Sequence, residues 1–336
     1  MSRGAYTRAG VDQGAADSAV AALVEALGAA RGLPSRQVPL PGHYASVIRL
    51  DERTGIALST DGVGTKLLVA EQLGRYDTIG IDCVAMNVND VICVGAEPLA
   101  MLDYIAIERA DVEICRQIGA GLARGAELAA IEIPGGELAQ LGELVSGFDI
   151  AGACFGTVAL DAIVDGSSVE PGDPVIGLPS SGLHSNGYTL ARAALEGIPL
   201  DDERLGRPLG DLLLEPTEIY VRAVLDLLGS DAEVRGLAHI TSGGLWNLLR
   251  LGAEVGWEID DPLPVPPVFG LIGDRAAIAD DEMHEVFNMG CGFCCVVAAG
   301  DEAAALDTLR SHYPEAKQIG RATAGRREVV RQPSRA

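Results

Sequence analysis

The chain has 336 residues, enough for two domains with sizeable cores, and 48% of its residues are hydrophobic. Its formal net charge of −23 argues against a nucleic-acid partner, because the phosphates of a nucleic acid would be repelled. A phosphorylated small molecule must therefore be held by a local group of backbone amides, basic side chains or magnesium.

The sequence also predicts the cellular setting. Residues 1–20 lack the apolar core of a signal peptide, and the longest uncharged apolar runs, 150–160 and 287–300, are shorter than the roughly 18 residues of a membrane span. Seven cysteines among apolar neighbours fit a reducing compartment. We therefore expect a cytoplasmic protein without a membrane span.

The amino-terminal half predicts alternating helices and strands. A proline-rich connector is expected over 33–42, and residues 131–140 place a double glycine before Glu137, which a surface turn explains equally well. Helices are expected at 15–30, 65–73, 82–94 and 112–128, and strands at 46–50, 56–59, 99–107 and 150–160.

A polar loop at residues 59–66 follows the second of these strands. It contains Asp61, two glycines, Thr65 and Lys66, and a hard cation and a polyphosphate need such groups. Lys66 is one of only two lysines in the chain. The spacing differs from that of the common P-loop, and a glycine-rich turn with an incidental Asp is the alternative interpretation.

The following segment, residues 80–98, predicts a buried helix from about Cys83 to Val94, capped by Asp82 and ended by Gly95. Its polar residues, Asp82, Asn87, Asn89 and Asp90, fall on two adjoining strips. Buried carboxylates and amides must be paired, hydrogen-bonded or bound to a cation. A cation site and a satisfied polar network are both compatible with this pattern.

The carboxyl-terminal half contains two similar units beyond the turn at 170–174, and we expect a domain boundary near residue 168. Each unit has a strand, a loop rich in Gly and Ser, and a helix whose N-terminus suits an anion. Ordinary N-capping explains either loop alone, whereas the pair favours a phosphosugar site. The strands are expected at 175–178 and 237–240, and the helices at 188–195 and 245–251.

Two features near the carboxyl end have simpler interpretations. The run Cys291–Cys295 lacks a second pair of Cys or His at zinc spacing and continues into apolar residues, so we expect a buried strand rather than a metal site. The polar tail from Thr323 is expected to be disordered.

Several motifs occur together in one order, and with them the chain, from about residue 9 to 321, resembles the phosphoribosylformylglycinamidine cyclo-ligase (aminoimidazole ribonucleotide synthetase) family. They are Ser-Thr-Asp-Gly-Val-Gly-Thr-Lys at 59–66, Asp-Thr-Ile-Gly-Ile-Asp at 77–82, Val-Asn-Asp at 88–90, Gly-Ala-Glu-Pro at 95–98, Leu-Asp-Tyr at 102–104, Ser-Ser-Gly-Leu-His-Ser-Asn-Gly-Tyr at 180–188, His-Ile-Thr-Ser-Gly-Gly at 239–244 and Phe-Asn-Met-Gly-Cys-Gly at 287–292.

The resemblance implies an α/β protein of two domains. Residues 1–168 would bind ATP and magnesium and would form a homodimer by joining their strands to those of a second subunit in a barrel, while residues 169–336 would bind the substrate. The implied reaction is ATP-dependent ring closure of formylglycinamidine ribonucleotide to aminoimidazole ribonucleotide in purine biosynthesis. ATP phosphorylates the amide oxygen, which the substrate's own nitrogen then displaces.

The resemblance also implies roles for individual residues. Asp61 and Asp90 would hold magnesium, with Glu137 as a further ligand, and Lys66 would neutralise polyphosphate charge. His184 would bind substrate and is the candidate for moving the proton lost on cyclisation. The implied nucleotide-binding residues are Asp61, Gly62, Gly64, Thr65, Lys66, Asp82, Asn89, Asp90 and Glu137; the implied ribonucleotide-binding residues are Ser181, His184, Ser185, Asn186, Thr241, Gly243 and Gly244.

Three alternatives stay open. A sister ATP-utilising enzyme, such as thiamine-monophosphate kinase or selenophosphate synthetase, shares the general plan, although the Ser-Gly-Leu-His-Ser-Asn-Gly loop favours the cyclo-ligase. A non-catalytic nucleotide-binding homologue is suggested by a glycine-poor loop at 39–45, and by Leu138 and Gln140 where the family has Thr and Glu. An anion-binding module without ATP chemistry would require Asp61 and Asp90 to be structural.

Overall fold

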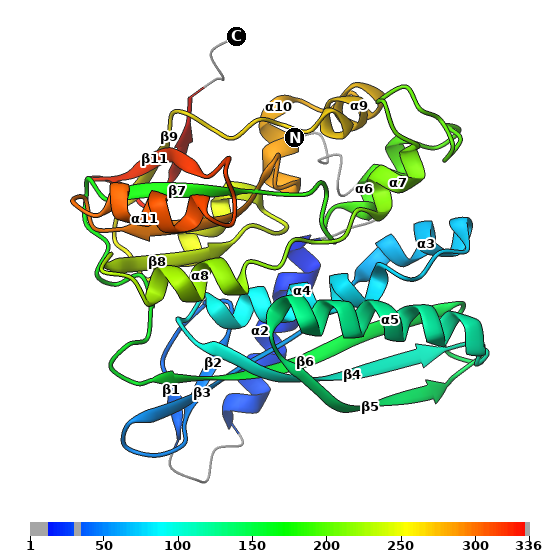
Figure 1. The fold of residues 1–336 in the computed structure, drawn as a ribbon, viewed down its shortest axis with the longest axis horizontal. Helices are drawn as coiled ribbons and strands as arrows, with labels where there is room; N and C mark the ends of the chain where they lie inside the picture. The colour runs from blue at the N-terminus through cyan, green and yellow to red at the C-terminus, as the bar shows by residue number, and fades with distance from the viewer. Residues whose placement is uncertain (1–12, 30–34, 333–336) are drawn as a thin grey trace.

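The computed structural model describes residues 13–29 and 35–332. Two sheets, one from each half of the chain, lie on opposite sides of a central layer of helices (Figure 1). Most of the segment 1–20, a few residues around the predicted connector and the end of the predicted polar tail lie outside the described residues. Within the described ranges, no helix is both long enough and apolar enough to cross a membrane.

The first sheet occupies residues 37–159 and has the strand order β1-β2-β3-β6-β4-β5. Its neighbouring strands are antiparallel except β4 and β5, which are parallel. Its strands are β1 Gln37–Val38, β2 Ser46–Arg49, β3 Thr54–Gly62, β4 Glu97–Ile107, β5 Glu132–Gln140 and β6 Phe148–Ala159; the helices of this half are α2 Gln13–Ala29, the 3₁₀ helix η1 Gly64–Lys66, α3 Leu67–Leu73, α4 Ile79–Ile92 and α5 Val112–Ala129.

The second sheet occupies residues 174–331 and has the order β12-β9-β11-β7-β10-β8. Its strands are β7 Pro174–Pro179, β8 Val234–His239, β9 Gly256–Ile259, β10 Cys291–Val297, β11 Lys317–Thr323 and β12 Val329–Arg331; the helices are α6 Tyr188–Ala194, α7 Leu209–Leu214, α8 Val221–Leu228, the 3₁₀ helix η2 Gly244–Arg250, α9 Pro267–Ala276, α10 Asp280–Val286 and α11 Glu302–Arg310. Every residue of β10 is buried, which confirms the predicted cysteine strand.

Helix α4 is the centre of the molecule, between the first sheet and the carboxyl-terminal half (Figure 1). Twelve of its fourteen residues are buried. It packs closely on α5 because glycines stand at the crossing: a Cβ on Gly80 would lie 2.1 Å from the Leu122 backbone nitrogen. The polar side chains of α4 are thereby held at fixed positions between the two halves.

Two local expectations were wrong, and one open alternative is excluded. Asp82 lies in the first turn of α4, whose N-cap is Thr78, so it does not cap the helix. The double glycine at 135–136 is part of strand β5, because it pairs with β4 instead of turning. Part of the tail beyond Thr323, which was expected to be disordered, forms β12 and pairs with β9. The helix expected at 245–251 is present as the 3₁₀ helix η2.

The close approach of α4 and α5 gives a stability prediction. Gly80→Ala should lower the free energy of unfolding by about 1 to 3 kcal/mol, since the new methyl group would meet backbone atoms that cannot move aside. Gly119→Ala on α5 is the control: no atom lies within 4 Å of its Cβ position, so stability should stay level or rise by up to about 1 kcal/mol. Urea denaturation measures both, and equal losses would contradict the packing described.

Candidate active site

A hollow of about 420 Å³ opens where the end of β3 faces the loops of the carboxyl-terminal half. Both halves of the chain contribute to its wall. The lining residues are Asp61, Gly62, Val63, Gly64, Thr65, Met86, Asp149, Ser185, Asn186, Gly187, Tyr188, Thr189 and Ser242. The fold therefore brings the first polar loop together with both glycine-rich loops of the second half.

Asp61 and Asp90 form the acidic side of the site. The backbone of Asp61 is fixed by Asn87, whose Oδ1 accepts from Asp61 N at 3.0 Å. Loss of hydration in the hollow, and then the Asp90 carboxylate, raise the pKa of Asp61 above its usual value, although the side chain still reaches solvent. A carboxylate destabilised in this way is suited to a cation. Asp90 does not line the hollow itself, and its Oδ1 lies 2.9 Å from His239 Nδ1.

The donor set fits one magnesium ion shared with phosphates. Magnesium usually takes one or two carboxylates from the protein and completes its shell with water and phosphate oxygens. Asp61 and Asp149 line the hollow, and Asp90 adjoins Asp61. The described residues hold no cluster of three or more His, Cys, Asp or Glu arranged for a metal, so Asp61, Asp90 and Glu137 do not meet within this chain.

Glu137 lies away from the hollow. It is on the edge strand β5, exposed and opposite Tyr104, and within the described ranges its carboxylate accepts only from the neighbouring Leu138 N. Leu138 is exposed on the same strand, and Gln140 accepts from Ala110 N at 3.3 Å. The two departures from the family pattern thus lie at the sheet edge and do not line the hollow.

Lys66 is buried and does not line the hollow. Its ammonium lies 2.8 Å from Asp82 Oδ2 and donates to the carbonyl oxygens of His184, at 3.2 Å, and Glu215, at 2.6 Å. Burial lowers its pKa, against the raising effect of Asp82. The ammonium that was expected to neutralise polyphosphate is therefore occupied by an ion pair within the first half and by two hydrogen bonds to the second half of the chain.

The other polar residues of α4 are also satisfied by hydrogen bonds. Asp82 accepts from the backbone and the hydroxyl of Thr217, both at 2.7 Å. Asn89 donates to Glu218 O at 2.8 Å and accepts from Tyr220 N at 3.0 Å. The alternative of a satisfied network therefore describes Asp82 and Asn89, which tie α4 to the segment 215–220.

The loop 181–187 presents some of its predicted residues to the hollow and buries others. Ser185 and Asn186 line the hollow, and Asn186 Nδ2 is buried without a hydrogen-bond partner among the described residues. Ser181 instead donates to Pro216 O at 2.6 Å. An unpaired amide beside a cavity is a group that a ligand can satisfy.

His184 is buried beneath this loop, with a positive φ of 61°. Its Nε2 accepts from Ser181 N at 3.3 Å. Burial, and then the nearby His239 and Lys66, hold its pKa well below the ordinary value, so the ring is neutral. The ring does not line the hollow.

In the third loop, only Ser242 reaches the hollow. Its hydroxyl donates to Asn186 Oδ1 at 3.1 Å. The Thr241 hydroxyl donates to Asn247 Oδ1 at 3.1 Å. Gly243 and Gly244 both have a positive φ where the loop enters η2. These predicted binding residues shape the loop rather than line the cavity.

Three residues at or beside the hollow have no role assigned from the sequence motifs. Asp149 and Thr189 line it, and His239 supports Asp90 from the end of β8. The signal for His239 was its place at the start of the His-Ile-Thr-Ser-Gly-Gly motif, two residues before Thr241. Asp149 and Thr189 gave no such signal, because only the sheet pairing and the α6 position bring them here.

The glycine-poor loop 39–45 is bound to η2. The Arg250 guanidinium lies 4.0 Å from the centre of the Tyr44 ring and donates to Gly42 O at 3.0 Å. The Tyr44 hydroxyl donates to Asn247 O at 3.0 Å. Burial, and then Arg250, lower the pKa of His43 to about 4. This loop therefore adds a second contact between the two halves.

Comparison with known proteins identifies the family. The model for "AIR synthase related protein, N-terminal domain" matches residues 42–158, and the C-terminal domain model matches residues 170–332. The phosphoribosylformylglycinamidine cyclo-ligase of Thermococcus gammatolerans is 46% identical over 328 residues, covering 95% of each chain. The chain belongs to the phosphoribosylformylglycinamidine cyclo-ligase family.

A second relative supports the family, and a solved structure supports the fold. The cyclo-ligase of Methanothermobacter thermautotrophicus is 50% identical over 279 residues, which cover 81% of this chain and 82% of the relative. A solved complex of AaThiL with AMPPCP and TMP has a TM-score of 0.63 at 18% identity, covering 88% of each chain. At that identity the likeness shows the fold alone. The resemblance and the fold class predicted from the motifs are confirmed.

The position of Lys66 in this cyclo-ligase-family site gives a second prediction. Lys66→Met should lower the free energy of unfolding by about 3 to 5 kcal/mol, because Asp82 would be left charged and buried. Adding Asp82→Asn should restore part of the loss. Lys317→Met, which breaks a surface pair with Asp261, should cost less than about 1 kcal/mol. Denaturant titration measures all three; unchanged stability with weakened ATP binding in Lys66→Met would instead assign Lys66 to the nucleotide.

Proposed function

We propose that this chain catalyses the ATP-dependent ring closure of formylglycinamidine ribonucleotide to aminoimidazole ribonucleotide in purine biosynthesis. The observation that carries the proposal is the convergence of the family's motifs, from both halves of the chain, on one hollow. The supporting comparison is 46% identity to a cyclo-ligase over 95% of both chains. A distant likeness at 18% identity gives no comparable support to a thiamine-phosphate kinase.

The reaction needs positioning more than covalent help. An amide oxygen is a poor leaving group until it is phosphorylated, and the nucleophile is part of the same substrate, so holding the reacting atoms together supplies much of the rate. In this proposal Asn186 Nδ2 donates to the substrate. The Ser242 hydroxyl, which donates to Asn186 Oδ1, fixes the orientation of that amide, and Ser185 helps to orient the substrate in the hollow. The neutral, buried His184 holds the loop rather than moving the proton.

Asp61 and Asp90 are the proposed magnesium ligands. Magnesium, when bound, would neutralise charge on the phosphate oxygens of ATP. His239 Nδ1 lies 2.9 Å from Asp90 and Ser59 Oγ lies 3.5 Å from it, so these two residues orient the carboxylate. Asn87 orients Asp61 through its backbone.

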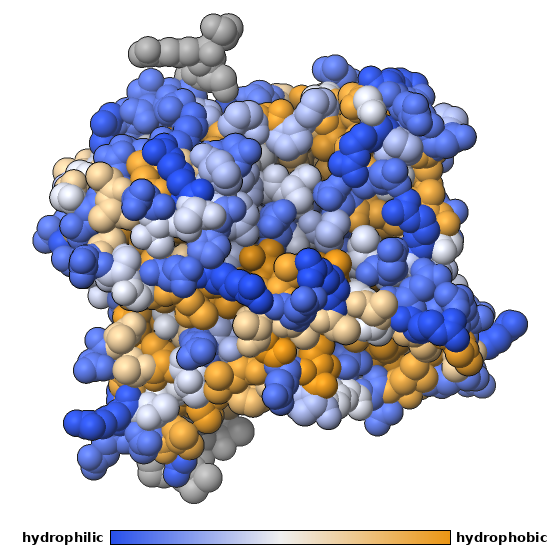
Figure 2. All heavy atoms as spheres, viewed as in Figure 1, coloured by the Kyte–Doolittle hydropathy of each residue, from blue (hydrophilic) through white to orange (hydrophobic). Residues whose placement is uncertain are grey.

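We also propose that the protein works as a homodimer. The face of the first sheet away from α4 carries exposed apolar side chains, and Figure 2 shows hydrophobic atoms gathered over this part of the molecule. Exposed apolar patches of this kind mark interaction surfaces. We call this surface the open sheet face; its members are Leu58, Leu102, Tyr104 and Phe155, each 39–50% exposed. A second copy packed here would also cover Glu137.

The carboxylate assignment predicts a loss of turnover. Asp61→Asn and Asp90→Asn should each lower kcat at least about a hundredfold, because charge stabilisation at the phosphates is lost, with far-ultraviolet circular dichroism unchanged. Asp307→Asn on the exposed face of α11 is the matched control and should keep full activity. The measurement is ADP release that depends on formylglycinamidine ribonucleotide. Full activity in both site variants would remove these residues from the mechanism.

The dimer proposal predicts a mass of about twice 34.9 kDa by light scattering at micromolar concentration. Leu102→Asp should shift the protein toward the monomer, because it places a charge in the open sheet face. Leu144→Asp, at an 82% exposed position outside the strands, should leave the mass unchanged. An active wild-type monomer would overturn the proposal.

A further inference from the structure

A second cavity, of about 480 Å³, lies beside the active-site hollow, between α3 of the first half and α6 and α7 of the second. The two cavities share Thr189, whose hydroxyl is 3.1 Å from the Thr65 hydroxyl. The volume is that of a small-molecule site. The lining residues are Val69, Gln72, Thr189, Arg192, Ala193, Leu195, Glu196, Gly197, Ile198, Leu200, Leu209 and Leu213.

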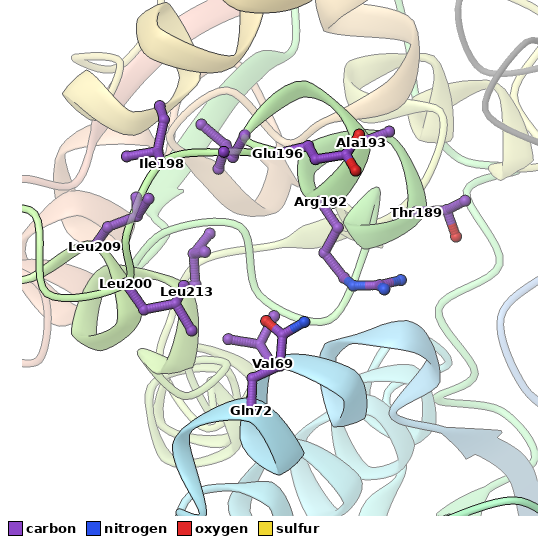
Figure 3. Close-up of a pocket in the computed structure, with 12 residues that line it drawn as sticks. Val69, Gln72, Thr189, Arg192, Ala193, Glu196, Ile198, Leu200, Leu209 and Leu213 are labelled. Carbon is purple, nitrogen blue, oxygen red and sulfur yellow. The ribbon is translucent and has the colours of Figure 1, made fainter.

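Arg192 is the unusual residue of this cavity. Figure 3 shows its side chain directed from α6 into the space facing Gln72 of α3. In the described part of the chain it makes no ion pair or hydrogen bond, whereas Arg75, near the same helices, pairs with Asp211. Glu196, the one carboxylate in the lining, forms no ion pair with it. The guanidinium is thus half-buried and available.

The two cavities differ in their charged side chains, although the exposed Glu196 also lines the second one. The hollow carries Asp61 and Asp149, and Arg192 is the one cationic side chain among the described residues that line either cavity. Lys66 is unavailable, because it is buried against Asp82. The net charge of −23 repels anionic groups at long range, so the positive charge of Arg192 is the local attraction for an anionic group in this region.

We propose that the Arg192 cavity holds the phosphomonoester of the ribonucleotide substrate, so that the substrate runs past Thr189 with its reacting end in the hollow. This assignment rests on the proposed function. Arg192 would contact the phosphate through its planar pair of N–H donors, and the Gln72 amide is the second donor. The leucines and isoleucine line the other end of the cavity, away from the Arg192 guanidinium (Figure 3).

The test separates binding of the phosphate from chemistry. Arg192→Met should raise the KM for formylglycinamidine ribonucleotide about tenfold to a hundredfold, while the KM for ATP and kcat change little. Arg192→Lys should recover part of the loss, because it keeps the charge but not the paired donors. Arg75→Met, which removes a neighbouring cation that is already paired and half-exposed, is the control and should keep the wild-type KM.

Calorimetry with ribose 5-phosphate provides a readout that needs no activity. Binding to wild type and its loss in Arg192→Met support the anion site. If that binding is lost while the substrate KM is unchanged, the cavity takes a free phosphoester and the substrate assignment is overturned. If neither changes, the anion site itself is overturned. If wild type shows no turnover but binds ribose 5-phosphate through Arg192, the proposed activity fails and the anion site stands.

Discussion

The buried ion pair of Lys66 and Asp82, both from the first half of the chain, connects the two halves of this protein through its hydrogen bonds to the second half. It lies at the start of α4, and the same two side chains bond to the backbone of the loop 181–187 and of the segment 215–217. An unpaired charge at this depth would cost several kcal/mol, so both partners must be in place for the halves to dock. The active-site hollow exists only because they dock, since its wall comes from both halves.

The polar residues near this ion pair fall into two groups, one structural and one available to a ligand. Asp82, Asn87 and Asn89 have their hydrogen bonds satisfied within the protein and fix the geometry. Asp61 and Asn186 keep unfavourable or unpaired polar groups at the hollow, which a bound ligand would relieve. Unsatisfied groups at a cavity reduce the stability of the empty protein, and that cost is expected where a site is preorganised for binding.

The sequence predicted strands and helices that frame the hollow, such as β3, α4, β7 and α6, and the loops that meet there, because glycine and hydroxyl residues follow apolar runs. It did not predict α7, α8, β9 or β11, which lie outside these motifs. It could not separate residues that line the hollow from residues that support it. Lys66 and His184 look catalytic by residue type, yet both are buried, since each belongs to the contact between halves. Arg192 sits on an alanine-rich helix, outside the motifs, and only the positions of α6 and α3 around one cavity show that its side chain faces that cavity.

The most direct test of this account is the reaction of the purified wild-type chain with formylglycinamidine ribonucleotide, ATP and magnesium. We expect aminoimidazole ribonucleotide and ADP to appear in equal amounts, and ADP release without the ribonucleotide to be negligible. ATP hydrolysis that ignores the ribonucleotide, or ATP binding without any product, would contradict the assignment of the hollow as a cyclo-ligase active site.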